Sequence, residues 1–188
     1  MTTKDRITQK GLAIFARHGF EGMSMRTLAD RIGIAQSVIY HYFQNKDELL
    51  KHIFDNTNTV LGKKRNNLPE TPTTADMMWQ RIEFQLDHAE EIVAVLKYYL
   101  AYRNEFHKQD NGYLPEKAYL HIEEVLRRGV HSGEIIAMDI EDEAKVITHA
   151  INGFLLEYYP KKPTGEEKKK LIASIHRFVM RSILKRNN

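Results

Sequence analysis

The sequence predicts an all-α protein with about nine helices, and three observations support this fold class. Almost every segment of the 188 residues repeats its apolar side chains with a helical period. No segment alternates apolar and polar β-branched residues as a half-buried strand would. The breaks between the periodic segments contain Gly, Pro, Asn or Ser, which favour turns and helix ends. We therefore expect helices joined by turns, without a β-sheet.

Four of these helices are expected in the first third of the chain. Gly19 is placed to end the first helix as a left-handed C-cap, and Gly33 is placed to end the second. Ser24 precedes the second helix and Asn45 the fourth, where each side chain can accept a backbone N–H of the first turn. The expected spans are residues 3–18, 25–31, 35–43 and 46–65.

Five amphipathic helices are expected after the segment 66–74, whose sequence NNLPETPTT has two prolines and no apolar period. Further breaks with turn residues occur at QDNGY, SGE and YPKKPTG. The expected spans are residues 75–86, 87–107, 115–131, 141–159 and 164–185.

The composition limits the possible functions. Apolar residues make up 42% of the chain and charged residues 28%, which is typical of a folded globular protein. The longest stretch without Asp, Glu, Lys or Arg has fourteen residues (32–45), too few for a bilayer span of ~20. No secretory leader is visible and there is no cysteine, so we expect a cytoplasmic protein without disulfides or thiolate sites.

Positive charge is concentrated near the N-terminus. Residues 1–65 hold eleven Lys or Arg and six Asp or Glu, a surplus of five, whereas the whole chain has a net charge of +3. The remaining residues therefore carry a net charge of −2. Such asymmetry is typical of a polyanion-binding domain joined to a domain with another task, although chance can also produce it.

Two short helices joined by a glycine turn, SMRTLADRIG and IAQSVIYHYF, have the dimensions of a helix-turn-helix. In such a unit the second helix presents its N-terminal residues to base edges in the major groove. Ile34, Ile39 and Phe43 have the spacing to seat this helix on a core. The side chains left outside carry an amide, a hydroxyl and two aromatic hydrogen-bonding groups, whereas a merely solvated helix favours Lys and Glu. These outward residues are Gln36, Ser37, Tyr40 and His41.

Three ordered sequences make this part of the chain similar to the DNA-binding domain of the TetR family of bacterial transcriptional regulators. They are FARHGF at 15–20, SMRTLA at 24–29 and IYHYFQNKDELL at 39–50. The resemblance covers about a quarter of the chain. It implies a DNA-binding domain at 1–48 and a helical effector-binding and dimerisation domain at 49–188. It also implies a homodimer, most simply a repressor, that binds a palindromic DNA operator and releases it when a small molecule binds.

The resemblance also assigns roles to single residues. It implies that the first helix of the motif is anchored to the DNA backbone, while the recognition helix at about 35–43 approaches bases and phosphates. The family commonly begins that helix with a serine cap, a basic residue, Gly and Thr, but this chain has AQSV at 35–38, so its operator cannot be inferred from relatives. The implied DNA-binding residues are Ser24, Arg26, Thr27, Gln36, Ser37, Tyr40, His41, Tyr42 and Lys46.

Several of these residues also allow a purely structural role. Ser24 can be an N-cap, Arg26 a solvated charge, and Tyr42 a packing residue between helices.

For the C-terminal body, the resemblance implies a dimer interface formed by the last two helices as half of a four-helix bundle. Ala150 and Gly153 would allow helices to approach closely, although packing within one chain would use the same residues. The expected interface residues are Ala150, Ile151, Phe154, Tyr158, Ile175, Phe178 and Val179.

Aromatic side chains gather between the predicted DNA-binding domain and the dimer helices. They are either core or the wall of an effector pocket, since tyrosines supply both apolar surface and hydroxyl groups. We expect a small apolar or aromatic effector. The candidate residues are Trp79, Phe84, Tyr98, Tyr99, Tyr102 and Phe106.

Two other function classes remain as alternatives. His88 with Glu91 and His121 with Glu124 have i, i+3 spacing, but isolated pairs are weak signals for a metal, so neither a metal nor another cofactor is expected. Hydrolase, P-loop, dinucleotide and metalloprotease motifs are missing from the sequence, and we expect no enzyme. A metal-binding or partner-binding helical protein without sequence-specific DNA binding is the alternative.

Overall fold

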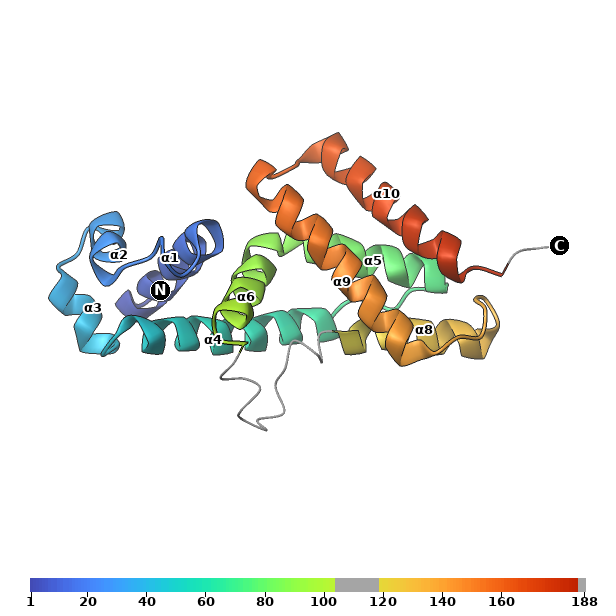
Figure 1. Cartoon of the computed structure of the whole chain (residues 1–188), viewed down its shortest axis with the longest axis horizontal. Coiled ribbons are helices and arrows are strands. Elements are labelled where there is room, and N and C mark those ends of the chain that lie inside the picture. The colour runs from blue at the N-terminus through green and yellow to red at the C-terminus, as the bar shows by residue number, and fades with distance from the viewer. Residues whose placement is uncertain (104–118, 186–188) are drawn as a thin grey trace. The chain divides into compact units, whose positions relative to one another are not determined.

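The computed structural model describes residues 1–103 and 119–185 (Figure 1). Within these ranges it contains nine α-helices, one 3-10 helix and no β-strand, apart from a single antiparallel bridge between Ile135 and Leu184. The predicted all-α class is confirmed. The described chain forms two compact units, unit 1 (residues 1–67 and 90–103) and unit 2 (residues 68–89 and 119–185).

Unit 1 contains the N-terminal helices and nearly all of α6. Gly33 ends α2 in the left-handed conformation (φ 74°, ψ 41°), as predicted. Gly19 ends α1 with a positive φ of 69°, but its ψ of −165° lies outside the left-handed helical region that we expected. The helices are α1 (Thr3–His18), α2 (Met25–Ile32), α3 (Gln36–Tyr42), α4 (Lys46–Asn66) and α6 (Ala89–Ala101).

The core of unit 1 lies where α1 packs on α2 and α4. A Cβ atom at Gly11 of α1 would lie only 2.8 Å from Ile53 Cδ1 of α4, so glycine allows these two helices to approach closely. Phe54 of α4 stacks on Tyr98 of α6, with ring centroids 4.5 Å apart. The expected domain boundary between residues 48 and 49 falls inside α4, and it stays a prediction about function.

Unit 2 is a bundle of four helices with one further 3-10 turn. The predicted spans agree with the observed ones to within a few residues where both are described, and the predicted segments 104–107 and 115–118 lie outside the described residues. None of the described helices has both the length and the apolar character needed to cross a bilayer. The elements are α5 (Thr74–Asp87), α8 (Leu120–Ser132), α9 (Ile140–Tyr158), η2 (Tyr159–Lys161) and α10 (Gly165–Ile183).

Polar contacts hold the start of α5 against the end of α8 in unit 2. The Glu134 carboxylate accepts the Thr74 N–H and the Ser132 hydroxyl, each at 2.8 Å. These hydrogen bonds, the Thr74 N–H first, lower the pKa of Glu134. A Cβ atom at Gly129 would lie 2.7 Å from the Thr74 side chain, so the absence of a side chain there permits this close contact.

Candidate nucleic-acid interface

Helix α2 begins with a reciprocal cap. Ser24 Oγ accepts the Thr27 N–H at 3.0 Å, and Thr27 Oγ1 accepts the Ser24 N–H at 2.9 Å. Ser24, Arg26 and Thr27 are all exposed. The predicted capping role of Ser24 is confirmed, while its contact with the DNA backbone stays a prediction.

The recognition helix α3 is seated by apolar side chains, as the sequence spacing predicted. Ile39 is fully buried and Phe43 is 2% exposed, whereas Ile34 is half-buried. The turn before α3 is closed by Gly33 and Ile34, whose N–H groups both donate to the Ala29 carbonyl. The orientation of α3 is therefore fixed by the core of unit 1.

The face of α3 opposite the core is open to solvent. Gln36, Ser37, Tyr40 and His41 are exposed, as predicted. Gln36 Nε2 lies 3.5 Å from the Tyr40 hydroxyl, so these two side chains stand next to each other on the helix. This surface, which we call the reading face, presents hydrogen-bonding groups to the surroundings. Its contact with bases stays a prediction.

The first turn of α3 lacks a side-chain cap. Ala35 occupies the N-cap position with extended backbone angles (φ −67°, ψ 143°), and no side chain accepts an N–H of the first turn. The family pattern has a serine at this position. Because this chain has Ala35 instead, the first turn of α3 lacks the hydrogen bond that a serine hydroxyl would accept.

Filling this gap should stabilise unit 1. We expect Ala35→Ser to raise the free energy of unfolding by about 1 kcal/mol, because its hydroxyl can accept an N–H of the first turn. Urea denaturation followed by circular dichroism measures this change. Ala13→Ser, the same change inside α1, is the control and should not stabilise. Equal effects of the two substitutions would contradict the capping explanation.

Lys46, expected to bind phosphate, is engaged within the protein. Its ammonium group donates to the Phe20 carbonyl at 3.0 Å and lies 3.4 Å from the centre of the Phe20 ring. Lys46 thus ties the start of α4 to the turn after α1, and a phosphate would have to share its ammonium group. Tyr42 is half-buried, with its ring edge-on to that of His41 at 5.0 Å.

Helix α6 contacts the DNA-binding motif through residues that the sequence did not indicate. The Lys97 ammonium donates to the carbonyls of Ala16 (2.6 Å) and Arg17 (3.3 Å) at the end of α1. Burial lowers the pKa of Lys97. The Tyr102 hydroxyl donates to Asp47 in the first turn of α4. Tyr102, expected at the effector, therefore supports the candidate DNA-binding unit in this structure.

The other predicted effector residues are divided between the two units. Tyr98 is buried and Tyr99 half-buried in unit 1, whereas Phe84 is buried and Trp79 half-buried in unit 2. The Trp79 ring is edge-on to that of His176, with centroids 5.4 Å apart. Phe106 lies outside the described residues.

Unit 2 also contains buried polar groups that the sequence analysis missed. Gln85 is 4% exposed and its Nε2 lies 3.1 Å from His121 Nε2. Gln85 Oε1 and the hydroxyl of Thr148, which is 3% exposed, are buried without a hydrogen-bond partner among the described residues. The signal in the sequence was a polar residue on the apolar stripe of a helix, since Gln85 follows Met78 by seven positions.

The predicted dimer residues fall into two groups. Ile151, Ile175 and Val179 are at most 1% exposed and belong to the core of unit 2, so they offer almost no surface to a partner, and their place in an interface stays a prediction. Ala150, Phe154 and Tyr158 are half-buried, and Phe178 is 61% exposed. The predicted stripes were wide enough to include both the buried and the outward side of each helix.

The histidine–carboxylate pairs do not extend to larger clusters. Within residues 1–103 and 119–185, no three His, Asp or Glu side chains converge in a way that could hold a metal ion. The His88 ring packs on that of Phe84, and His121 contacts Gln85.

Comparisons with known proteins agree with this arrangement. Residues 7–53 match the family described as bacterial regulatory proteins, tetR family. An uncharacterised helix-turn-helix transcriptional regulator of Haemophilus influenzae is 32% identical over 90 residues, which cover 46% of this chain and 48% of the relative. The match thus spans about half the length of this curated relative.

Solved structures resemble the chain over nearly its whole length. A transcriptional regulator of Saccharomonospora viridis, solved in complex with choline, aligns with a TM-score of 0.78 at 16% identity, covering 97% of this chain and 98% of that one. The ketosteroid transcriptional regulator of Mycobacterium tuberculosis aligns with a TM-score of 0.77 at 17% identity, covering 98% and 96%. At such identities the likeness concerns the fold.

The family match falls on the segment that forms α1 to α3 and the start of α4, where the capped α2, the Gly33 turn and the seated α3 build a helix-turn-helix. With this motif and its sequence match, residues 7–53 form a helix-turn-helix domain of the tetR family of bacterial regulatory proteins, and the chain as a whole shares the all-α fold of the solved regulators.

Proposed function

We propose that the protein is a cytoplasmic transcriptional regulator, most simply a repressor, that binds a palindromic DNA operator as a homodimer. The observation that carries this proposal is the reading face of α3, which combines Gln36, Ser37, Tyr40 and His41 on a helix seated by buried residues. Glutamine can bind adenine with two hydrogen bonds, and serine accepts several bases. The protein acts by binding rather than by catalysis.

Selection of bound sequences from a random duplex library, at two salt concentrations, tests this function directly. A recovered palindrome supports a sequence-specific dimer and supplies the probe for later assays. Failure at both salt concentrations, with folded and ligand-free protein, contradicts the proposal. That outcome favours a metal-binding or partner-binding helical protein.

Two substitutions should separate base reading from backbone binding. Gln36→Ala is expected to change the preference at one operator position by about 1–3 kcal/mol, because its amide meets a base edge. Arg26→Ala should weaken binding to all sequences alike and reduce the salt slope by about 1, because the guanidinium neutralises a phosphate. Titration of operator variants at several salt concentrations measures both effects. If the two substitutions acted alike on every sequence, the division of roles would be wrong.

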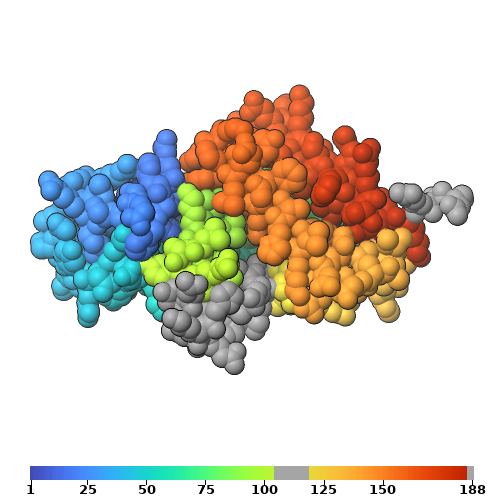
Figure 2. Space-filling model, viewed as in Figure 1, coloured from blue at the N-terminus to red at the C-terminus, as the bar shows by residue number. Residues whose placement is uncertain are grey.

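The dimer proposal rests on exposed apolar side chains of α9 and α10. These two helices, orange and red in Figure 2, lie at the surface of unit 2. Val146 is 62% exposed on α9 and Phe178 is 61% exposed on α10. A Cβ atom at Gly153 would meet nothing within 4 Å, so a partner helix can approach α9 closely there. We assign the interface to these residues with Ala150, Phe154 and Tyr158.

An effector would act on the spacing of the two DNA-binding units in the dimer. The effector shifts the population from the dimer that fits the operator to a dimer that fits it poorly. The size of this shift depends on how much more tightly the effector binds the second state than the first. Trp79 and Phe84 favour an effector with an apolar or aromatic body. The buried oxygens of Gln85 and Thr148 add a requirement for a polar group, since buried polar atoms are usually hydrogen-bonded.

A further inference from the structure

The end of α1 lacks the backbone closure that commonly ends a helix. Gly19 follows α1 with a ψ of −165°, so the chain does not turn back in the left-handed conformation that lets the following N–H groups donate to the last carbonyls. Among the described residues, no backbone N–H donates to the carbonyls of Ala16 and Arg17. These two carbonyls are therefore open to donors from another part of the chain.

A lysine of α6 supplies these donors. The Lys97 ammonium lies 2.6 Å from the Ala16 carbonyl oxygen and 3.3 Å from that of Arg17. The carbonyl end of a helix carries partial negative charge, so a cation is favoured there, and a charged donor makes the stronger hydrogen bond. Lys97 is half-buried, so water competes less for its ammonium group than at an exposed site. Lys97 thus caps the C-terminus of α1, although it lies 80 positions after Arg17.

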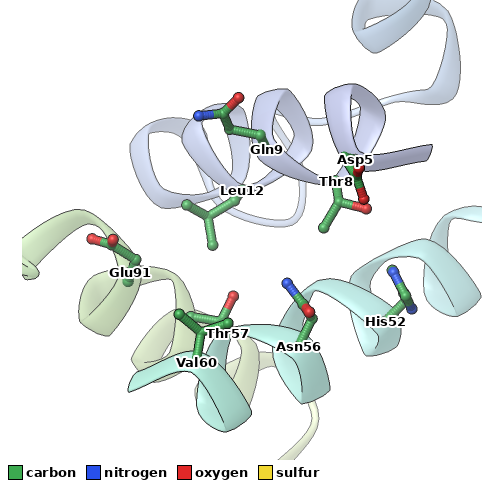
Figure 3. Close-up of a pocket in the computed structure, with 9 residues that line it drawn as sticks. All are labelled: Asp5, Thr8, Gln9, Leu12, His52, Asn56, Thr57, Val60 and Glu91. Atoms are coloured by element: carbon green, nitrogen blue, oxygen red, sulfur yellow. The ribbon is translucent and has the colours of Figure 1, made fainter. Parts of the chain in front are cut away.

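Packing against α4 alone leaves α1 room to shift. The two helices touch closely where Gly11 meets Ile53. Beside this contact they leave a cleft of about 200 Å³, which Leu12 of α1 and Val60 of α4 help to line (Figure 3). A gap of this size forfeits contacts that would otherwise fix the angle between two helices. The polar contacts at the end of α1 consequently matter for its position.

The turn after α1 carries this position into the DNA-binding motif. Residues 19–23 connect α1 with the Ser24 cap of α2. Within this turn, the Phe20 carbonyl accepts a hydrogen bond from the Lys46 ammonium. The Phe20 ring lies edge-on to the ring of Tyr102, which directly follows α6, with centroids 5.8 Å apart. Helix α6 and the residue after it therefore contact both the last residues of α1 and the turn that begins the motif.

We propose that Lys97 is a positioning residue for DNA binding. By capping α1 it holds the turn at 19–23, and this turn determines where α2 begins and hence where α3 and its reading face lie. The inference rests on the DNA-binding function proposed above, but it assigns to Lys97 no contact with DNA. Loss of the ammonium group should therefore weaken recognition of the operator while the number of neutralised phosphates stays the same.

Two substitutions of Lys97 test this inference on the full chain, with the operator recovered by selection as the DNA probe. Lys97→Met keeps an unbranched apolar stem but loses the cation and its donors, and we expect the dissociation constant to rise about tenfold. The slope of its salt dependence should not change, since no phosphate contact is lost. Lys97→Arg keeps a cationic donor, and its dissociation constant should stay within about threefold of that of the unchanged protein. Titrations at several salt concentrations measure these quantities.

Lys63→Met is the matched control, because it removes the same charge from an exposed lysine near the end of α4. It should change the dissociation constant by less than about twofold, since salt screens distant charges. Circular dichroism before each titration establishes that the variant is folded. If Lys97→Met does not fold, Lys97→Gln, which keeps neutral donors, takes its place with the same expected direction. A role in stability alone would lower the unfolding midpoint without changing the affinity of the folded protein for the operator.

Several outcomes would overturn this role of Lys97. An unchanged operator affinity of folded Lys97→Met would overturn the inference and leave the proposed function standing. A salt slope reduced by about 1 would place Lys97 on a phosphate instead. Equal losses for Lys97→Met and either Lys97→Arg or Lys63→Met would show that the cap on α1 is not the cause. If the unchanged protein selects no operator, the proposed function fails, and this inference fails with it.

Discussion

Replacing Phe43 by alanine is expected to lower the free energy of unfolding of unit 1 by about 3–5 kcal/mol. The Phe43 side chain is 2% exposed and closes the end of α3. Its ring centroid lies 5.2 Å from that of His52 and 5.4 Å from the Lys4 ammonium. Removing it leaves a cavity under the recognition helix. Since small domains are stable by only about 5–15 kcal/mol, much of the total would be lost.

Urea denaturation can assign this effect to one unit. Circular dichroism reports all helices, whereas the fluorescence of Trp79, the single tryptophan of the chain, reports unit 2. We expect Phe43→Ala to lower the urea concentration at which the circular dichroism signal of unit 1 is lost. The same substitution should weaken operator binding. Tyr40→Ala, on the exposed side of the same helix, should change stability by about 0.5 kcal/mol or less. Equal stability of the two variants would show that Phe43 does not support α3.

The second large effect concerns assembly. Phe178→Asp is expected to raise the dissociation constant of the dimer at least about 100-fold, equivalent to about 2.7 kcal/mol. Phe178 is 61% exposed in the single chain, so an aspartate carboxylate there stays hydrated and should not destabilise the isolated subunit. A symmetric interface then buries two unpaired charges, and each burial is unfavourable by several kcal/mol. Analytical ultracentrifugation over a range of concentrations measures the change.

Two further substitutions show whether the effect belongs to this surface. Leu100→Asp introduces the same charge at a 59% exposed leucine of α6 and should leave the dimer intact. Ile175→Asp places the charge in the core of unit 2 and should unfold that unit rather than merely separate the subunits. A Phe178→Asp protein that remains dimeric at micromolar concentration would exclude Phe178 from the interface.

The fold could be predicted because its signals are local. Apolar residues repeat with a helical period, and Ser24, Gly33 and Asn45 begin or end helices through hydrogen bonds to residues at most five positions away. The reading face was predictable for the same reason, since Ile39 and Phe43 determine which side of a short helix is buried.

Contacts between distant residues could not be predicted in this way. The Lys97 ammonium reaches the carbonyl of Ala16, 81 residues earlier, and no pattern in a single sequence pairs these groups. Ile175 and Phe178 illustrate a second limit. Both are apolar and three positions apart on one helix, so periodicity places them on one wide stripe, although only Ile175 is buried by its own chain.

The discontinuous course of unit 1 affects how the protein is made. Residues 1–67 and 90–103 form this unit, and the segment between them belongs to unit 2. During translation the N-terminus is made first. Phe54 can therefore stack on Tyr98 only after 44 further residues are synthesised, and the Ala16 carbonyl can accept from Lys97 only after 81. A nascent chain that stops before residue 90 has the complete helix-turn-helix but lacks the helix that braces it.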